Sequence, residues 1–478
     1  MEQKCFSDDC VFEELTDYKR DLGLVESISV VIGRIIGSGI FRTPGPIMAL
    51  VSCTSLFALV WILGGIVTIF HAVCYAELVA MMPRSGGPYV YLKTAYGPVW
   101  AFLRGWAMFF VSETGAIAAV ALVFAEYLNE IWKILFKVPY SHVTEILIAL
   151  AIIWMLTAVN LFGVFVSGVF QNIFSTVKII AIGIIIGVSF SGGGSLSHFT
   201  SPFLPEEFSW ATVLAIGAAL RLAFFAFSGW EGATYIAEEV KNPRRNLPLS
   251  LLLGITGVMV LFLGTNAAYI YQLPVKTIAA SHGIAADAMK AAIGGAGGIL
   301  ISIAVMLSTF GNVSTQILCK ARTWQAMARD DLFFSRLEIL HGRYRTPNNA
   351  LMAQAAWASV LLVALLAVYL LFDIKSGASY EMIIAFFTAT GTIFNIMTIY
   401  SLVVFRKRYP DVPRPYKARL YPFSVIMVLA LLTFYLVVTL ITALVPSLLG
   451  LVLMSSGLVY YFWKSKNKEK KSAHNAGG

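Results

Sequence analysis

Two places where glycine and serine interrupt a long apolar segment are the clearest candidates for chemistry in this sequence. The first break lies at residues 37–39 within the apolar run 30–41, and the second lies at residues 228–229 within the run 224–232. Unwinding a helix there frees amide and carbonyl groups that hydrocarbon cannot satisfy, so each break must face protein, water or a polar ligand. Paired breaks of this kind in two halves of a chain indicate an inverted-repeat transporter with a site near the membrane midplane.

The groups freed at the first break have opposite polarities. The half-helix that follows Gly37 offers N–H groups and a positive dipole end to an anion, whereas the half-helix that ends near Ile36 offers carbonyl oxygens to a cation. An anion site a few ångströms from a cation site matches a zwitterionic α-amino acid. We therefore predict that main-chain atoms of ten residues bind such a substrate: Ile35, Ile36, Gly37, Ser38, Gly39, Ile40, Phe225, Ala226, Phe227 and Ser228.

A simpler interpretation is that these glycines only let helices pack closely, as small residues often do in membranes. Two breaks at related positions, with Glu231 beside the second, favour the binding site over that interpretation. Phe225 ends the half-helix before the second break and is predicted to act as a gate that covers the substrate and excludes water. The alternative for Phe225 is a packing aromatic.

The amino-acid composition indicates that the elements that position these residues are membrane-spanning helices. Of the 478 residues, 58% are apolar and 13% are charged, whereas soluble chains average about 25% charged residues, so an ordinary soluble enzyme is excluded. The sequence predicts an all-α polytopic membrane protein, because a bilayer core needs roughly 20 apolar residues per helix. The predicted spans are 24–50, 54–82, 97–126, 143–163, 165–190, 209–239, 249–273, 295–320, 349–372, 380–405, 421–445 and 447–463.

The distribution of Lys and Arg predicts the orientation of these twelve spans. The two tails and the loops on their side hold 25 of the 35 basic residues, and the opposite loops hold five. The positive-inside rule therefore predicts that both termini are cytoplasmic. The net charge of +9 reflects this topology and possible contact with anionic lipid rather than nucleic acid.

The spans divide into two repeats of five and a final pair. The predicted segments are an N-terminal cytoplasmic tail (1–23), the first inverted repeat (24–190), the second inverted repeat (209–405), spans 11 and 12 (421–463) and a C-terminal cytoplasmic tail (464–478).

Several charged residues fall inside predicted spans, where each needs a partner or a purpose because a central charge costs about 2.5–3.5 kcal/mol on insertion scales. We expect Arg34 to pair with Glu113, and Glu231 to cap the half-helix after the second break. Glu77 and Arg104 are expected to reach the membrane surface by snorkelling. Lys178 lies too deep to snorkel, and its ammonium is expected to donate to the freed carbonyls of span 1 around Gly33 to Ile36. The sequence leaves the partner of Arg221 open.

Other motifs predict no further chemistry. The five cysteines are scattered and form no disulfide or metal framework. His71 has no second ligand at metal spacing and is interpreted as a packed histidine, so no metal site is expected. The glycosylation triplet at residues 312–314 falls inside a span and is expected to be inert. No glycine-rich phosphate loop is present, so neither ATP-driven transport nor a cofactor is expected.

Six motifs in order give the chain a specific resemblance along nearly its whole length. They are residues 35–41, 83–89, 227–231 continuing into 238–248, 326–330, 345–347 and 413–417 followed by Tyr421-Pro422. With these motifs the chain resembles the L-type amino acid transporter family of the amino acid–polyamine–organocation superfamily. The chain departs from the family pattern at Arg34, where a small or uncharged residue is usual, and at Glu113-Thr114.

The resemblance implies a leucine-transporter-like fold with two inverted repeats and broken spans 1 and 6, working by alternating access in the cell membrane. It implies exchange or uptake of neutral L-amino acids, and it implies that Lys178 occupies the place where sodium-coupled relatives hold an ion. Transport is then expected to be sodium-independent, with proton coupling left open. The loop 127–142 has no cysteine, so no covalent heavy-chain partner is expected.

Two other classes of function would use the same membrane helices. A membrane-embedded amino acid sensor would use the same site but signal through its tails, and the tails here are short. An intramembrane enzyme needs an acid–base or metal constellation on facing helices, and none is evident, so no enzymatic activity is expected.

Overall fold

A computed structural model describes residues 12, 16–205, 207–281, 283–372 and 379–476. The regular elements in these ranges are helices, with one isolated parallel bridge between Leu22 and Val240. Twelve of the helical segments are long and apolar enough to cross a membrane. The predicted all-α polytopic architecture is confirmed, whereas Lys375, one of the basic residues used for orientation, lies outside the described ranges.

The first group of elements covers the region predicted as spans 1 to 5. It contains α1 (Leu24–Ile35), α2 (Gly39–Arg42), α3 (Pro44–Val51), α4 (Thr54–Met81), α5 (Pro88–Tyr96), α6 (Pro98–Ala107), a π-helical turn (Met108–Ser112), α7 (Glu113–Phe136), α8 (His142–Leu161) and α9 (Val164–Ser191).

The second group covers the remaining spans and their connections. It contains the 3-10 turn η3 (Leu196–Phe199), α10 (Trp210–Phe227), α11 (Gly232–Tyr235), η4 (Ala237–Glu239), α12 (Pro243–Gln272), α13 (Val275–Ala280), α14 (Ile284–Ile293), α15 (Gly295–Arg329), η5 (Ser335–Glu338), α16 (Asn348–Phe372), α17 (Ser379–Arg408), α18 (Phe423–Thr442) and α19 (Leu444–Ala476).

Both glycine-containing interruptions lie between helices. α1 ends at Ile35 because Ile36 adopts extended dihedral angles (φ −72°, ψ 93°), and α2 begins three residues later at Gly39. α10 ends at Phe227 because Ser228 is extended (φ −66°, ψ 157°), and α11 begins at Gly232. Gly229 between them has φ +94°, a conformation that residues with a Cβ rarely adopt.

Four helices continue beyond the predicted spans, all for one physical reason. α7 continues to Phe136 instead of 126, α15 continues to Arg329 instead of 320, and α12 begins at Pro243 instead of 249. α19 extends to Ala476, so the predicted C-terminal tail 464–478 is helical over most of its length. Apolar length measures only the part of a helix inside the bilayer, and a helix continues into water where no residue breaks it.

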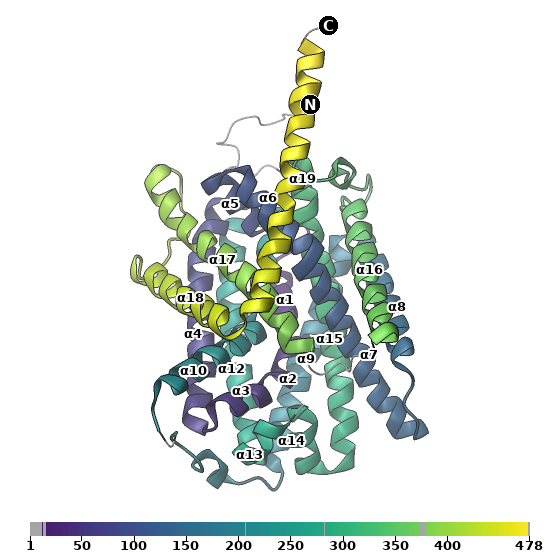
Figure 1. The fold of residues 1–478 in the computed structure, drawn as a ribbon, viewed down its shortest axis with the longest axis vertical. Coiled ribbons are helices and arrows are strands. Elements are labelled where there is room, and N and C mark those ends of the chain that lie inside the picture. The colour runs from purple at the N-terminus through teal and green to yellow at the C-terminus, as the bar shows by residue number, and fades with distance from the viewer. Residues whose placement is uncertain (1–11, 13–15, 206, 282, 373–378, 477–478) are drawn as a thin grey trace.

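The helices form one bundle whose two ends carry different connecting elements (Figure 1). α13 and α14 lie at one end, and α5 lies at the other end, beyond which α19 projects. Contacts join both described ends of the chain at the α5 end: Leu22 pairs with Val240, and Lys464 lies 3.4 Å from Asp331 in an ion pair. The two ends of the chain therefore lie on the same side of the bundle, as an even number of spans requires.

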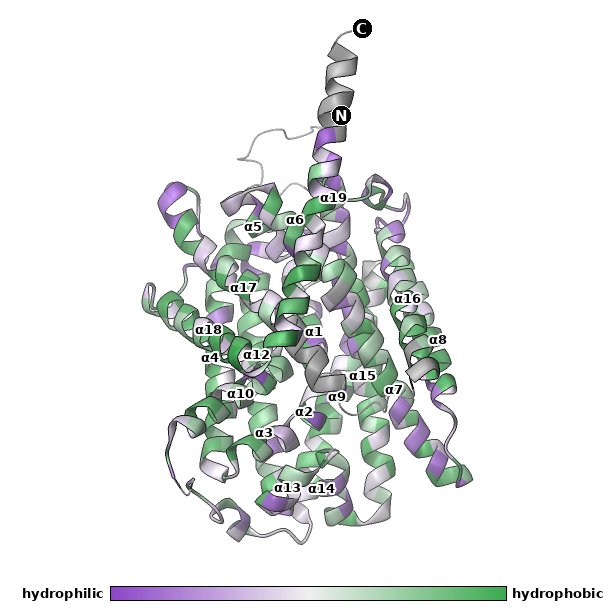
Figure 2. Ribbon diagram, in the orientation of Figure 1, coloured by the Kyte–Doolittle hydropathy of each residue, from purple (hydrophilic) through white to green (hydrophobic). Residues whose placement is uncertain are grey.

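The outer surface of the bundle is apolar along the length of the spans (Figure 2). On α9, for example, Ile173, Ile180 and Ile184 are 57%, 55% and 45% exposed. Their spacing of seven and four residues places them on one helix face. A face of this kind is suited to contact with lipid rather than water.

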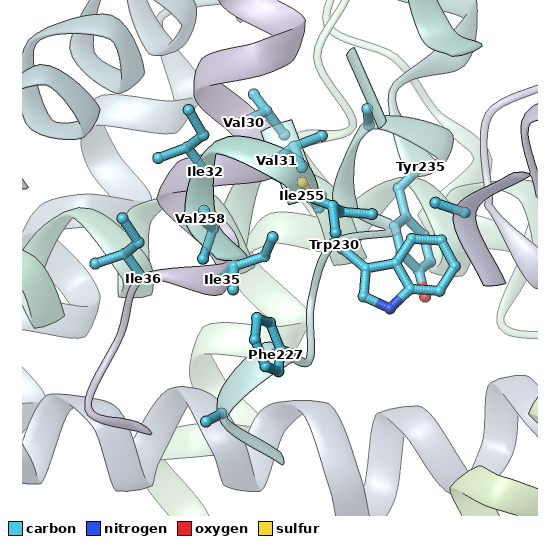
Figure 3. Packing of buried hydrophobic residues seen from close by; sticks show 14 of the residues in the cluster. Val30, Val31, Ile32, Ile35, Ile36, Phe227, Trp230, Tyr235, Ile255 and Val258 are labelled. Carbon is cyan, nitrogen blue, oxygen red and sulfur yellow. The ribbon is translucent and has the colours of Figure 1, made fainter. Parts of the chain in front are cut away.

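α1 lies inside the bundle, in contact with α9, α12 and α15. Its apolar side chains, among them Val30, Val31 and Ile35, are buried, and Figure 3 shows them with Ile255 and Val258 of α12. α12 approaches α1 closely, since a Cβ added at Gly254 would meet Val31 Cγ1 at 2.6 Å. This packing fixes the position of the helix end that the first break exposes.

Candidate substrate-binding site

The carbonyl groups freed at the end of α1 are bound by a lysine from α9. Lys178 is 1% exposed, and its Nζ donates hydrogen bonds to Gly33 O (2.7 Å) and Ile36 O (2.9 Å). An ammonium carries three donors and no acceptor, so it can act on these carbonyls as a bound cation would. The sequence predicted contact between this lysine and the carbonyls of residues 33–36, and that contact is confirmed.

α15 supplies two further donors that the sequence analysis missed. Asn312 Nδ2 donates to Arg34 O (2.7 Å) and Gly33 O (3.2 Å), and Ser308 Oγ donates to Ile36 O (3.2 Å). The sequence did contain a signal for these donors, because Ser308 and Asn312 are polar residues one helical turn apart within an apolar span. The sequence analysis interpreted Asn312 only as the first residue of a glycosylation triplet. A buried side-chain amide usually forms hydrogen bonds with neighbouring backbone groups, as Asn312 does here.

A cavity of about 250 Å³ lies between the two breaks. Seven of the ten predicted substrate-binding residues line it: Ile35, Gly37, Ser38, Gly39, Phe225, Ala226 and Ser228. The side chains of Ile36, Ile40 and Phe227 are instead buried in the apolar core. Phe227, for example, packs edge-on against Trp61 with ring centres 5.9 Å apart.

The two breaks touch each other at Gly39 and Ala226. A Cβ built on Gly39 would lie 2.8 Å from Ala226 Cα and 3.1 Å from Ala226 Cβ. Because backbone cannot move aside as a flexible side chain can, only glycine allows this approach. Phe225 is half-buried beside this contact and lines the cavity, a position from which its ring can cover a ligand.

A cluster of charged side chains lies beside the break in α1. Arg34 Nη2 donates to Glu113 Oε2 at 2.7 Å, which confirms the predicted pair. Lys320 of α15 lies 3.1 Å from Glu113 Oε1 and 3.7 Å from Glu231 Oε1. The sequence analysis placed Lys320 at the very end of the span 295–320, although α15 continues nine residues further. The absence of any helix breaker before Asp330 was the available signal.

Glu231 does not cap a helix with its side chain, contrary to prediction. It occupies the N-cap position of α11, but its side chain makes no capping hydrogen bond there. The carboxylate points instead toward Lys320, whose Nζ also lies 3.9 Å from the centre of the Tyr235 ring.

The predicted snorkelling of Glu77 and Arg104 was also wrong. Glu77 is fully buried and accepts two hydrogen bonds from Arg406, at 2.9 and 2.6 Å. Arg104 is 7% exposed and lines the cavity. Both side chains therefore lie in polar surroundings inside the protein. Arg221, whose partner the sequence left open, donates to Thr442 Oγ1 at 3.3 Å.

His71 packs between aromatic rings on the cavity wall. Its ring centre lies 4.8 Å from that of Trp230 and 5.3 Å from that of Tyr75. In the part of the chain that the structure describes, no three His, Cys, Asp or Glu side chains form a group able to hold a metal ion.

Comparisons with known proteins identify the family of the chain. A family model described as amino acid permease matches residues 22–466. The b(0,+)-type amino acid transporter 1 of Mus musculus is 30% identical over 450 residues, which cover 94% of this chain and 88% of the relative. The chain belongs to the amino acid permease family.

Two further relatives extend the comparison across kingdoms. The large neutral amino acids transporter small subunit 2 of Homo sapiens is 30% identical over 458 residues, covering 94% of this chain and 82% of the relative. The serine/threonine exchanger SteT of Bacillus subtilis (strain 168) is 30% identical over 455 residues, covering 94% of this chain and 98% of the relative. The predicted resemblance to L-type transporters is confirmed, and the matched family is one of amino acid transporters rather than sensors.

Proposed function

We propose that this permease exchanges neutral L-amino acids across the cell membrane by alternating access and without sodium. The observation that carries the proposal is the ammonium of Lys178, which binds two carbonyls at the end of α1, beside a cavity bounded by both breaks. A positively charged side chain in this position leaves no need for a bound metal cation.

The main chain of the two breaks binds the ends of the substrate in this proposal. Near Ser38 and Gly39 the start of the next half-helix offers N–H groups to the substrate carboxylate. Carbonyl groups near Ile35 and between Phe225 and Ser228 accept from the substrate ammonium. Phe225 acts as the gate. Main-chain recognition of this kind is independent of the substrate side chain, which suits a family with varied amino acid substrates.

The wider architecture follows the same proposal. Residues 24–190 and 209–405 are the two inverted repeats, residues 421–463 form the two additional spans, and both termini are cytoplasmic. The excess of Lys and Arg on the side of both termini supports this orientation. Alternating access then consists of movement of one group of spans against the other around the fixed site.

The chain works without a covalently attached heavy chain in this proposal. The connection between α7 and α8, at residues 137–141, contains no cysteine. Cys53, Cys74 and Cys319 are buried free thiols, so they are not placed to bond to an external partner.

The direct test is exchange by the purified chain alone in liposomes. Uptake of labelled serine and labelled leucine is measured into liposomes loaded with the same unlabelled amino acid and into empty liposomes. We expect faster uptake into the loaded liposomes for at least one of the two substrates. Uptake no faster than in protein-free liposomes contradicts transport by the chain alone, and equal uptake into loaded and empty liposomes contradicts exchange.

A further inference from the structure

The charges around the substrate cavity do not balance. Three cations, Arg34, Arg104 and Lys320, lie near two carboxylates, Glu113 and Glu231. Arg34 and Lys320 bind those carboxylates directly, so the cluster without Arg104 is neutral. One positive charge, that of Arg104, remains.

Arg104 is buried without an acidic partner. Arg104 is only 7% exposed, and its guanidinium forms no ion pair within 4.0 Å among the described residues. Its Nε is buried with no hydrogen-bond partner in the same part of the chain, and its guanidinium carbon lies 5.6 Å from the centre of the Phe394 ring. A buried charge without a partner costs several kcal/mol, so an unpaired guanidinium in a cavity indicates a ligand that neutralises it.

Other polar side chains line the same cavity. His71 is 6% exposed, lines the cavity with Arg104, and has a buried Nε2 without a hydrogen-bond partner in the described structure. Thr68 and Ser112 also line the cavity. The hydroxyls of Thr68 and Ser112 already donate to Gly64 O and Ala107 O, but apolar ligand atoms would leave Arg104 and His71 Nε2 unsatisfied. The cavity therefore suits a ligand that brings a hydrogen-bonding group to these two side chains.

We propose that, in addition to neutral L-amino acids, the cavity accepts L-amino acids with a carboxylate side chain, and that Arg104 binds this carboxylate. The inference rests on the proposed function, because the two breaks hold the α-carboxylate and α-ammonium common to all substrates. The side-chain carboxylate then meets a planar guanidinium, which matches it with two parallel hydrogen bonds. A neutral substrate occupies the same site but leaves the charge of Arg104 unpaired.

Glutamate and glutamine provide the test, because they have nearly the same size and differ by one charge. Labelled glutamate and labelled glutamine are taken up separately by liposomes that contain the purified chain and the same unlabelled amino acid. We expect the half-saturating concentration of glutamate to be roughly tenfold or more below that of glutamine, the ratio that about 1.4 kcal/mol produces. An equal or lower value for glutamine overturns the proposal.

Variants assign the preference to Arg104. In Arg104→Gln the difference between the half-saturating concentrations of glutamate and glutamine is expected to disappear, and in Arg104→Lys part of that difference is expected to remain. Arg221→Gln is the matched control, since Arg221 lies outside the cavity lining and donates to Thr442. An unchanged preference in Arg104→Gln overturns the role of Arg104. Should that variant not fold, the wild-type comparison still decides whether the side-chain carboxylate is recognised.

The proposed function and this inference fail in different ways. Exchange of serine or leucine with no preference for glutamate leaves the transporter proposal in place and removes the anionic subsite. Absence of exchange for every amino acid, glutamate included, removes both.

Discussion

Replacing Lys178 by methionine removes the ammonium from the end of α1 while keeping a long, flexible side chain. Two hydrogen bonds are lost, to Gly33 O (2.7 Å) and to Ile36 O (2.9 Å). A hydrogen bond with a charged donor contributes about 1.5–3 kcal/mol, so the loss of two such bonds is the upper limit of the effect on stability of the break. Both carbonyls keep one neutral donor, from Asn312 and Ser308, and the cost of burying the ammonium disappears with it.

The net loss of free energy that stabilises the break is therefore smaller than the sum of the two lost hydrogen bonds. We expect about 2–3 kcal/mol, which corresponds to an increase of roughly 30- to 150-fold in the half-saturating substrate concentration. The assay is concentration-dependent exchange in liposomes with protein of verified monodispersity. Lys276→Met is the matched control, because Lys276 lies exposed on α13 and the same substitution there is expected to change nothing. A Lys178→Met protein that exchanges with the wild-type concentration dependence refutes the assigned role of Lys178.

Three further predictions concern the breaks and the charges beside them. Gly39→Val is expected to abolish exchange in a protein that still purifies as a monodisperse species, because its Cβ would lie 2.8 Å from Ala226 Cα; wild-type exchange by this variant places the site elsewhere. Phe225→Leu is expected to preserve folding and slow exchange sharply, since a smaller side chain covers the cavity less well; normal turnover contradicts the gate. Arg34→Met and Glu113→Gln are expected to show a coupling of about 1 kcal/mol or more in a thermal-stability double-mutant cycle, and additive effects contradict an energetically significant pair.

The positions of the two breaks were accessible from the sequence because adjacent glycine and serine residues, at 37–39 and at 228–229, interrupt apolar spans at related places in the two halves of the chain. Gly37 and Ser228 follow the ends of half-helices directly. The contact of Lys178 with the freed carbonyls was predicted from its depth together with the resemblance to the L-type transporter family. The pairing of Arg34 with Glu113 followed from the cost of burying either charge alone.

Other features depend on helix rotation, which the sequence does not specify. Asn312 and Lys320 reach the break only because α15 turns those residues toward α1. In a span with polar residues on more than one face, periodicity selects no single inward direction. Helix rotation also decides the position of Arg104. Its place near the end of a predicted span suggested snorkelling, whereas the packing of α6 directs its side chain into the cavity. Tertiary packing rather than local sequence decides these positions.

The measurement that tests the central claim most directly is exchange in liposomes with sodium replaced by choline on both sides of the membrane. The account predicts the same exchange rate in both salts, because the ammonium of Lys178 occupies the carbonyl site at the end of α1 in place of a metal cation. A large loss of exchange in choline would show that a sodium ion completes the site, and it would contradict the role assigned to Lys178.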